Sequence, residues 1–315
     1  TDYTPSTGIL KPNASSFTRC TFTLDNDNLI ESYGARFSEL TRLWGVAGVR
    51  FAGCTFTNTS SIDSRGCGIR AVDAGFRVDT YCSREIMNSD CSCPGQYATH
   101  SAFSGFSTAI RVSTTGSPFA VTVDETSFAN NSTGISVSGN NHATVTRCQF
   151  DLSLTPELSF NVTGLELSAC TGFLVEGNAF SRSTSSFPTY GIKAVGTGIS
   201  NNSLYRNTFT GLTYGIYSSG NNGGSFSGLR FSCNTFSQNT HDIYVTSGQV
   251  AETQGNSAAG ADNSFSSGAT GNFEVLNPRF QLDYYYSSGG SHSPTARTSN
   301  VLLHPNALAN GCAST

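Results

Sequence analysis

The chain has 315 residues, a formal charge of −4 and 12% charged residues, well below the roughly 25% of an average globular domain. Its 22 phenylalanines can form a buried core, which argues against disorder. Lysine occurs only at Lys11 and Lys193 and no basic run exists, so nucleic-acid binding is not expected. No apolar stretch approaches the ~20 residues of a membrane-spanning helix, so membrane insertion is not expected.

Motifs for metals, cofactors and catalysis are missing from the sequence. Cys91 and Cys93 are too close together for a zinc pattern, and the five histidines are isolated. No phosphate-binding loop, nucleophile elbow or His-Glu-x-x-His motif occurs. We therefore expect no cofactor, no metal and no catalytic residue. Ten cysteines favour an oxidising compartment and thus a secreted or cell-surface protein.

The N-terminal residues 1–19 precede the first recognisable repeat, and we interpret them as a cap over an open strand edge. A phrase of one small or amide residue, any residue and Phe then recurs along the chain. It ends at Phe22, Phe56, Phe128, Phe150, Phe180, Phe209, Phe236 and Phe265. A second phrase follows the later copies, namely Gly134-Ile135, Gly164-Leu165, Gly191-Ile192, Gly215-Ile216 and Asp242-Ile243, with earlier versions at Gly68-Ile69 and Ala109-Ile110.

The spacing of the second phrase predicts a β-solenoid. From Ile110 to Ile243 the intervals are 25, 30, 27, 24 and 27 residues, too variable for a helical solenoid with a fixed unit. Apolar residues alternate within each copy, as in strands. The repeats predict a parallel β-helix over residues 20–280, with about nine or ten coils stacked at about 4.8 Å.

Equivalent residues of successive coils should form inner columns. We expect Phe150, Phe180, Phe209 and Phe236 to stack inside, and Ile192, Ile216 and Ile243 to form another inner column. Asn178, Asn207, Asn234 and Asn263 should form an amide ladder along one turn. The alternative for each Asn is an ordinary left-handed turn residue.

The cysteines fall into two groups. Cys82, Cys91 and Cys93 crowd the polar segment 81–100, and we predict that they contribute to at least one disulfide. Cys20 and Cys54 occupy equivalent repeat positions, so they either bridge adjacent coils or are small buried residues.

The C-terminal residues 281–315 depart from the repeat. We expect a last strand around Asp283–Tyr286, and then a linker-like tail that begins with the Gly/Ser-rich stretch 287–293. The tail would lead toward another part of a larger protein.

The two phrases resemble those of right-handed parallel β-helix proteins of the pectate-lyase-like superfolds, and the resemblance spans roughly residues 15–280. More narrowly, segments 49–58 and 66–76 are similar to large secreted surface proteins of Bacteroidetes, which typically carry a sorting domain for type IX secretion. The resemblance implies an all-β, right-handed parallel β-helix that is secreted. It implies no catalytic residues.

Acidic residues are scattered rather than paired. Asp124 and Glu125 are adjacent, so we expect them to face opposite sides of a strand. The grouping most typical of an enzyme is Asp73 and Asp79 with Arg77 or Arg70, for which a solvated coil surface is the alternative.

One outward column is the candidate binding site. The residues directly after the second phrase read Ser136, Glu166, Lys193, Tyr217 and Tyr244. Tyr190, Tyr214 and His241 lie two residues before the apolar position and border this column. Exposed tyrosines suit sugars or a protein partner, whereas plain cross-strand packing is the alternative.

These features favour a non-catalytic, extracellular or cell-surface module with a structural or adhesive role and glycans among its expected ligands. Other surface proteins or further copies of the chain are the remaining expected partners. One alternative is a polysaccharide lyase or glycoside hydrolase. The other is a self-assembling filament or surface-layer subunit.

Overall fold

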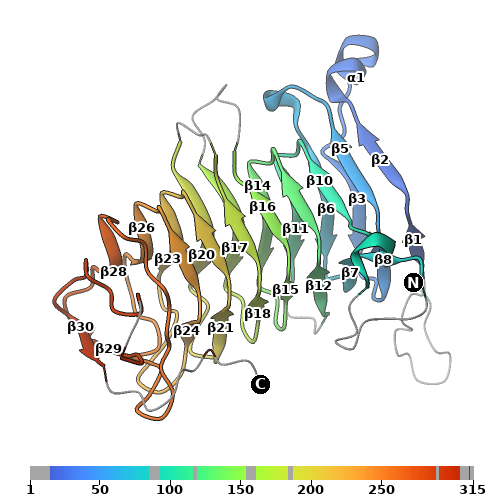
Figure 1. Cartoon of the computed structure of the whole chain (residues 1–315). Coiled ribbons are helices and arrows are strands. Elements are labelled where there is room, and N and C mark those ends of the chain that lie inside the picture. Colours follow the sequence, from blue (N-terminus) through green and yellow to red (C-terminus); the bar gives the residue numbers. More distant parts are fainter. Residues whose placement is uncertain are drawn as a thin grey trace.

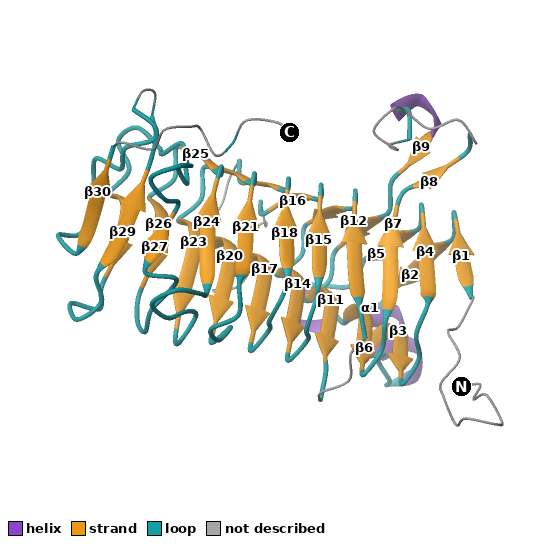
Figure 2. Ribbon diagram, turned by 90° about the horizontal axis from the view of Figure 1, so that it is seen from below, coloured by secondary structure: helices purple, strands orange, loops and turns teal. Residues whose placement is uncertain are grey.

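The computed structural model describes residues 15–84, 93–115, 119–153, 161–183, 187–288, 291–305 and 312. The chain winds into the predicted parallel β-helix, a rod along which the sequence advances from one end to the other (Figure 1). Each full coil contributes one strand to each of three parallel sheets, which we call sheets 1, 2 and 3 (Figure 2).

The three sheets consist of short strands that occupy equivalent places in successive coils. Sheet 1 contains β1 (Ser16–Thr18), β4 (Val49–Ala52), β7 (Phe76–Asp79), β12 (Val121–Asp124), β15 (Thr144–Thr146), β18 (Leu174–Glu176), β21 (Asn202–Tyr205) and β24 (Leu229–Ser232). Sheet 2 contains β2 (Thr21–Leu24), β5 (Thr55–Asn58), β10 (Ala102–Ser104), β13 (Ser127–Ala129), β16 (Gln149–Asp151), β19 (Ala179–Ser181), β22 (Thr208–Thr210) and β25 (Thr235–Ser237). Sheet 3 contains β3 (Glu39–Trp44), β6 (Cys67–Val72), β11 (Thr108–Ser113), β14 (Thr133–Ser138), β17 (Val162–Ser168), β20 (Thr189–Val195), β23 (Tyr214–Ser219), β26 (His241–Val245) and β28 (Gly271–Val275).

The core consists of the columns that the repeats predict. In sheet 2, rings of successive coils lie nearly parallel with centroids 4.4–6.0 Å apart, from Phe22 through Phe56, Phe103, Phe128, Phe150, Phe180, Phe209 and Phe236 to Phe265. In sheet 3, Ile192, Ile216 and Ile243 are in register and fully buried. Both predicted columns are therefore confirmed.

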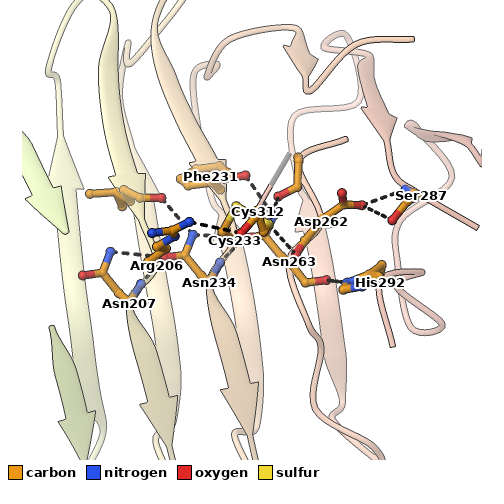
Figure 3. Close-up of a disulfide and its surroundings, with 12 residues drawn as sticks. Arg206, Asn207, Phe231, Cys233, Asn234, Asp262, Asn263, Ser287, His292 and Cys312 are labelled. Carbon is orange, nitrogen blue, oxygen red and sulfur yellow. Dashed lines mark hydrogen bonds between the residues drawn. A yellow bond between two sulfur atoms is a disulfide. The ribbon is translucent and has the colours of Figure 1, made fainter. Parts of the chain in front are cut away.

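The amide ladder runs along the turn between sheets 1 and 2. The Oδ1 atom of Asn207 accepts both the backbone N–H and the side-chain amide of Asn178, at 3.0 and 2.9 Å. The same pattern links Asn207 to Asn234 and Asn234 to Asn263 (Figure 3). The backbone N–H of Asn263 then donates to the hydroxyl of the fully buried Tyr284, at 3.0 Å. A tyrosine thus ends the ladder where no further asparagine follows.

Two disulfides occur among the described residues. Cys82–Cys93 confirms the prediction for segment 81–100, where β8 (Tyr81–Cys82) pairs antiparallel with β9 (Ala98–Thr99) after a 3₁₀ turn, η2 (Gly95–Tyr97). Cys91 lies outside the described residues. Cys233–Cys312, which was not predicted, joins residues 79 apart in sequence (Figure 3). Cys20 and Cys54 are free thiols in this structure, Cys54 buried and Cys20 partly exposed.

Both ends of the β-helix differ from the boundaries expected from the sequence. Strand β1 lies inside the expected cap 1–19 and pairs with β4. At the other end, β29 (Leu282–Tyr285) is the expected last strand, but β30 (Val301–His304) lies in the part that was expected to be a linker-like tail. Both belong with β27 (Thr253–Gln254) to a separate three-stranded parallel sheet. These strands lack the second phrase, because their inward residues are Leu282, Tyr284 and Val301 rather than a Gly-Ile pair.

A short helix interrupts the first coil. Helix α1 (Asn26–Tyr33) begins at Asp25, whose side chain accepts the N–H of Asn28 at 3.1 Å. It ends at Gly34, whose φ of +66° is the left-handed conformation that glycine adopts without steric cost. A 3₁₀ turn, η1 (Ile62–Ser64), lies in the next coil, and these insertions border one end of sheet 3.

Candidate functional site

Two adjacent columns of side chains cover the outer face of sheet 3. The residue directly after each buried Ile or Leu turns outward, as strand alternation predicts. The residue directly before it, such as Gly134 in β14, is buried instead, and the second column lies two residues before the Ile or Leu. The outer column, in strand order, is Arg42, Arg70, Arg111, Ser136, Glu166, Lys193, Tyr217, Tyr244 and Glu274. The border column is Glu39, Cys67, Thr108, Thr133, Thr163, Tyr190, Tyr214, His241 and Gly271. Cys67, Thr108 and Thr163 in this column are buried, whereas its three rings are partly exposed.

Five rings from these columns form one cluster, the aromatic face, which comprises Tyr190, Tyr214, Tyr217, His241 and Tyr244. In the border column, Tyr214 stacks on Tyr190 and on His241, with centroids 4.9 Å apart in each pair. Tyr217 and Tyr244 stand beside them in the outer column at 6.1 Å from each other. Edge-on and tilted ring contacts, with centroids 5.1 to 5.8 Å apart, join the columns. The sequence-predicted tyrosines and His241 are thus brought together.

The rings of the aromatic face are partly exposed, so they remain accessible from solvent. Burial raises the pKa of the Tyr190 hydroxyl, and the neighbouring hydroxyls of Tyr214, Tyr217 and Tyr244 raise it further. Burial likewise raises the pKa of Tyr244, with smaller effects from Tyr214 and Glu274. Both hydroxyls therefore stay protonated near neutral pH, where each can donate one hydrogen bond and accept others.

Charged groups flank the aromatic face on both sides along the rod. Lys193 lies 3.7 Å from the carboxylate of Glu166 and 5.2 Å from the ring centroid of Tyr190. Ser136 donates to Glu166 at 3.3 Å. The pair of Glu166 and Lys193 is a partly exposed ion pair, a type that contributes about 0–1 kcal/mol to stability. The candidate residues Glu166 and Lys193 therefore lie beside the aromatic face rather than apart from it.

Sequence reasoning missed the partner of His241. The Nδ1 atom of His241 lies 2.5 Å from a carboxylate oxygen of Glu274, one strand further along the rod. Glu274 follows Phe273, which replaces the usual Ile of the second phrase, and Gly271 faces His241 in the border column. A repeat alignment extended from Ile243 to Phe273 would have found this pair.

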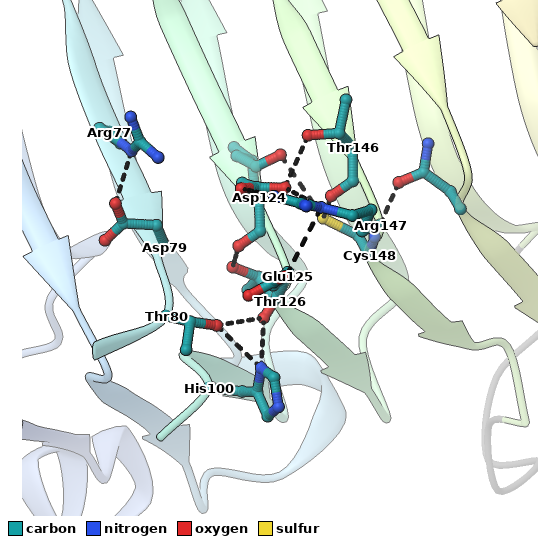
Figure 4. A network of polar contacts seen from close by, with 12 residues as sticks. Arg77, Asp79, Thr80, His100, Asp124, Glu125, Thr126, Thr146, Arg147 and Cys148 are labelled. Carbon is teal, nitrogen blue, oxygen red and sulfur yellow. Dashed lines mark hydrogen bonds and ion pairs between the residues drawn. The ribbon is translucent and has the colours of Figure 1, made fainter. Parts of the chain in front are cut away.

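A second polar group lies on the turn side of sheet 1 (Figure 4). Asp79 is held by Arg50 at 3.0 Å and by Arg77 at 2.5 Å. Asp73 instead accepts bonds from Thr115. Arg70 lies on sheet 3, near Glu39. Of the enzyme-like grouping considered from the sequence, the structure forms the pair of Arg77 with Asp79 and places Asp73 and Arg70 elsewhere.

The expectation that Asp124 and Glu125 face opposite sides is wrong. Both carboxylates approach Arg147, at 2.5 Å from Asp124 and 3.6 Å from Glu125 (Figure 4). Glu125 has a φ of +46°, so the chain turns there and strand alternation no longer applies. Asp124 also accepts the hydroxyl of Thr146 at 2.7 Å, which leaves this carboxylate fully engaged.

A hollow of about 370 Å³ borders this network and is lined by His100, Glu125, Thr126, Ser127, Arg147 and Gln149. The Nδ1 atom of His100 lies 2.8 Å from the hydroxyl of Thr80 and 3.1 Å from the carbonyl of Glu125. The Asp and Arg groups here neutralise one another. In the described part of the chain, no group of three or more His, Cys, Asp or Glu side chains is arranged to hold a metal ion.

The fold and the outward columns define a class of protein, the parallel β-helices that present long side-chain columns to solvent. The sequence profile described as "Right handed beta helix region" matches residues 86–258, which is more than half of the chain. The chain belongs to this family, and its β-helix is right-handed. No curated protein matches the sequence significantly.

One solved structure is similar, that of the periplasmic alginate epimerase AlgG in a double-mutant form. The similarity covers 92% of this chain and 84% of that chain, at 8% identity and a TM-score of 0.31. A TM-score this low supports no inference about a site or an activity. Among the described residues, no helix is both long enough and apolar enough to cross a membrane.

Proposed function

We propose that the chain is a non-catalytic, extracellular glycan-binding module, and that the aromatic face of sheet 3 is its binding surface. The observation that carries the proposal is the cluster of five partly exposed rings in two adjacent columns. A tyrosine ring offers a flat apolar face and a polar tip, which complement the C–H faces and hydroxyls of a sugar. The rings pack against one another, so they are held in place before a ligand arrives.

Location outside the cytosol is part of the proposal. The disulfides Cys82–Cys93 and Cys233–Cys312 support it, since such bonds persist in oxidising compartments and are rare in the cytosol. We further propose display at a cell surface after type IX secretion, on the resemblance of segments 49–58 and 66–76 to surface proteins of Bacteroidetes. An adhesive or structural role fits a rigid rod that carries one ligand along its side.

A second candidate function, cleavage of a polysaccharide, rests on the pair of His241 with Glu274. A carboxylate that holds one ring nitrogen of a histidine orients the other for proton transfer, and the rings of Tyr214 and Tyr244 pack against the imidazole of His241. Binding is preferred because five rings meet at the aromatic face, whereas the well-protected carboxylates of Asp79 and Asp124 lie on sheet 1, away from His241 and Glu274, and are each held by arginine.

The test is binding of soluble polysaccharides by the whole protein and by the variant Tyr217→Ala/Tyr244→Ala. Loss of two stacked rings should weaken binding roughly tenfold or more, since about 1.4 kcal/mol corresponds to a factor of ten. The matched control is Tyr205→Ala/Tyr285→Ala, which removes two partly exposed tyrosines from other sheets and should leave affinity unchanged.

Equal affinity of Tyr217→Ala/Tyr244→Ala and the unaltered protein would reject the aromatic face as the site. The test variant and the control variant should both keep the melting temperature of the unaltered protein within a few degrees, because outward side chains contribute little core burial. Release of reducing ends or unsaturated sugars from the same polysaccharides would establish the second candidate instead.

A further inference from the structure

The outer face of sheet 3 changes character along the rod. At the end opposite the aromatic face, three successive strands place Arg42, Arg70 and Arg111 in register in the outer column. Their Cα atoms therefore repeat at the strand spacing of about 4.8 Å. Serine, Glu166 and Lys193 separate these arginines from the tyrosines.

The arginine column carries more positive than negative charge. Glu39 is the shared partner of Arg42 and Arg70, with its carboxylate 3.8 Å from Arg70. Arg111 donates to the hydroxyl of Thr108 at 3.1 Å and forms no ion pair with any described residue. Its guanidinium is exposed and therefore available to an anion.

A hollow of about 260 Å³ lies beside this column, where the loops that follow α1 and β5 meet the first residues of β6 and β11. Its lining includes Arg36, Arg65 and Arg111, with the hydroxyls of Ser64 and Ser107 and one carboxylate, Asp63. Arg65 donates to the carbonyl and the side-chain oxygen of Asn130, at 3.0 and 3.4 Å. The guanidinium groups of Arg36 and Arg111 against the one carboxylate of Asp63 favour an anionic occupant. Arginine is the residue that best matches carboxylate and sulfate geometry, because its fork can donate two parallel hydrogen bonds.

The two ends of the face are close enough for one linear ligand. Arg111 on β11 and Lys193 on β20 are three strands apart in the same column, which is roughly 14 Å at the spacing of a β-sheet. The aromatic face begins on β20 with Tyr190. A polymer that lies across the strands, parallel to the rod axis, would contact both groups.

We propose that the ligand is an anionic polysaccharide that lies along sheet 3, with its carboxylate or sulfate groups at Arg42, Arg70, Arg111 and the adjoining hollow, and its sugar rings on the aromatic face. The proposal rests on the proposed function and narrows it to one class of glycan. Carboxylate and sulfate groups both accept paired hydrogen bonds from arginine. Testing one sulfated polymer and one carboxylated polymer shows which of the two groups the protein binds.

The first experiment compares dextran sulfate, polygalacturonate and unmodified dextran as probes for the whole protein. We expect both charged polymers to bind at least tenfold more tightly than dextran if the arginines recognise charge in general. Preference for dextran sulfate or polygalacturonate alone would assign the site to sulfate or carboxylate respectively. Equal binding of dextran and both charged polymers would overturn the proposal.

The second experiment uses Arg70→Gln/Arg111→Gln, which leaves the contact of Arg42 with Glu39 in place. This variant should bind the charged polymer about tenfold more weakly, because hydrogen bonds between charged groups contribute more to the binding free energy than neutral ones. The matched control is Arg230→Gln/Arg279→Gln, which makes the same change in net charge at sites away from sheet 3 and should bind normally. Equal losses in both variants would show a nonspecific charge effect and overturn the proposal.

Ionic strength provides an independent readout. The Debye length falls from about 30 Å at 0.01 M salt to about 3 Å at 1 M, so binding through exposed arginines should weaken steeply over this range. Binding that needs Tyr217 and Tyr244 but ignores both salt and Arg70→Gln/Arg111→Gln would refute anion recognition and leave the proposed function standing. Failure of every polymer to bind would refute both.

Discussion

At the turn between sheets 1 and 2, one residue per coil adopts a left-handed conformation and decides where its neighbours point. The φ angles at these positions are between 46° and 67°, at Arg19, Gly53, Glu125, Arg147, Gly177, Arg206, Cys233 and Asp262. Only two of the eight are glycine, although a side chain there costs about 1–2 kcal/mol. The ion pair of Arg147 with Asp124 and the disulfide of Cys233 use side chains at this strained position.

Individual side chains in this turn could not be placed from the sequence. Strand alternation predicts opposite directions for Asp124 and Glu125, but a left-handed glutamate gives no sequence signal, since nothing but its backbone angle distinguishes it. The residue after it is easier to predict, because Asn178, Asn207, Asn234 and Asn263 recur in phase with phenylalanine.

The free cysteines should differ in reactivity according to burial. Burial raises the pKa of Cys67 to about 11 and that of Cys148 to about 12, and only the thiolate reacts with alkylating agents. At about pH 8 the folded protein should therefore be alkylated at the partly exposed Cys20, with Cys67 and Cys148 protected until it is unfolded. Peptide mass spectrometry after timed iodoacetamide treatment measures this order.

Denatured protein is the control for this labelling experiment, since every free thiol should then react. Modification of Cys148 in the folded protein as fast as Cys20 would contradict the burial argument.

At the scale of a single element, the asparagine ladder is a continuous row of hydrogen bonds that crosses from coil to coil. Each side chain accepts from the coil before it and donates to both neighbours, as Asn207 does with Asn178, Val175 and Asn234. Burial is complete or nearly so along the ladder, so each group would lack water if its partner were removed.

Asn207→Ala should destabilise the protein by about 2–4 kcal/mol, because the buried N–H of Asn178 and its side-chain amide would lose their acceptor. Asn207→Ser should cost less. Ser101 occupies the equivalent position in an earlier coil, accepts the N–H of Cys54 at 3.0 Å and donates to a carbonyl at 2.8 Å. Urea unfolding of the two variants measures the difference.

An exposed amide supplies the control, since Asn201→Ala should change the free energy of unfolding by less than about 0.5 kcal/mol. Equal stability of Asn207→Ala and Asn207→Ser would show that the serine hydroxyl does not replace the amide.

The inner columns were predictable because parallel stacking repeats the same environment in every coil. Phe150 and Ile192 recur in phase with their counterparts, so the period survives loops of variable length. The same phase gave the aromatic face, since outward residues stack as regularly as inward ones. The pair of His241 with Glu274 was not predicted from the repeat, because the last coil of sheet 3 has Phe273 in place of the usual Ile.

At the scale of the whole molecule, the ends of the rod carry features that do not belong to the repeat. Strands β29 and β30 and the disulfide Cys233–Cys312 add to the C-terminal end without the Gly-Ile phrase. The hollow lined by Arg36 and Arg65 arises where insertions of different coils meet. Contacts between insertions have no period, so neither the hollow nor the disulfide could be read from the repeats.

Removal of the longer disulfide should loosen one end of the rod only. Cys233 and Cys312 close a loop of 79 residues, worth about 4–5 kcal/mol in the chain-entropy model. In a solenoid each coil contacts mainly its neighbours, so Cys233→Ser/Cys312→Ser should speed hydrogen exchange in β27, β29 and β30. Strands β10 to β14 should keep their exchange rates. Hydrogen-exchange mass spectrometry resolves the two regions.

Cys82→Ser/Cys93→Ser is the control, because that bond joins residues only 11 apart within an insertion beside sheet 1. It should alter exchange near β8 and β9 alone. Uniform acceleration along the rod in either variant would contradict independent behaviour of its ends.

The register of sheet 3 also fixes the spacing of every outward column of side chains. Backbone hydrogen bonds hold successive strands about 4.8 Å apart, and no outward side chain can change that interval. A bound polymer brings a repeat length of its own, and two unequal periods laid side by side drift out of step. Contacts would match well over a few coils and then be lost. The affinity would therefore rise with the length of the polymer only up to a limit, and the difference between the polymer repeat and the strand spacing would set that limit rather than the length of the rod.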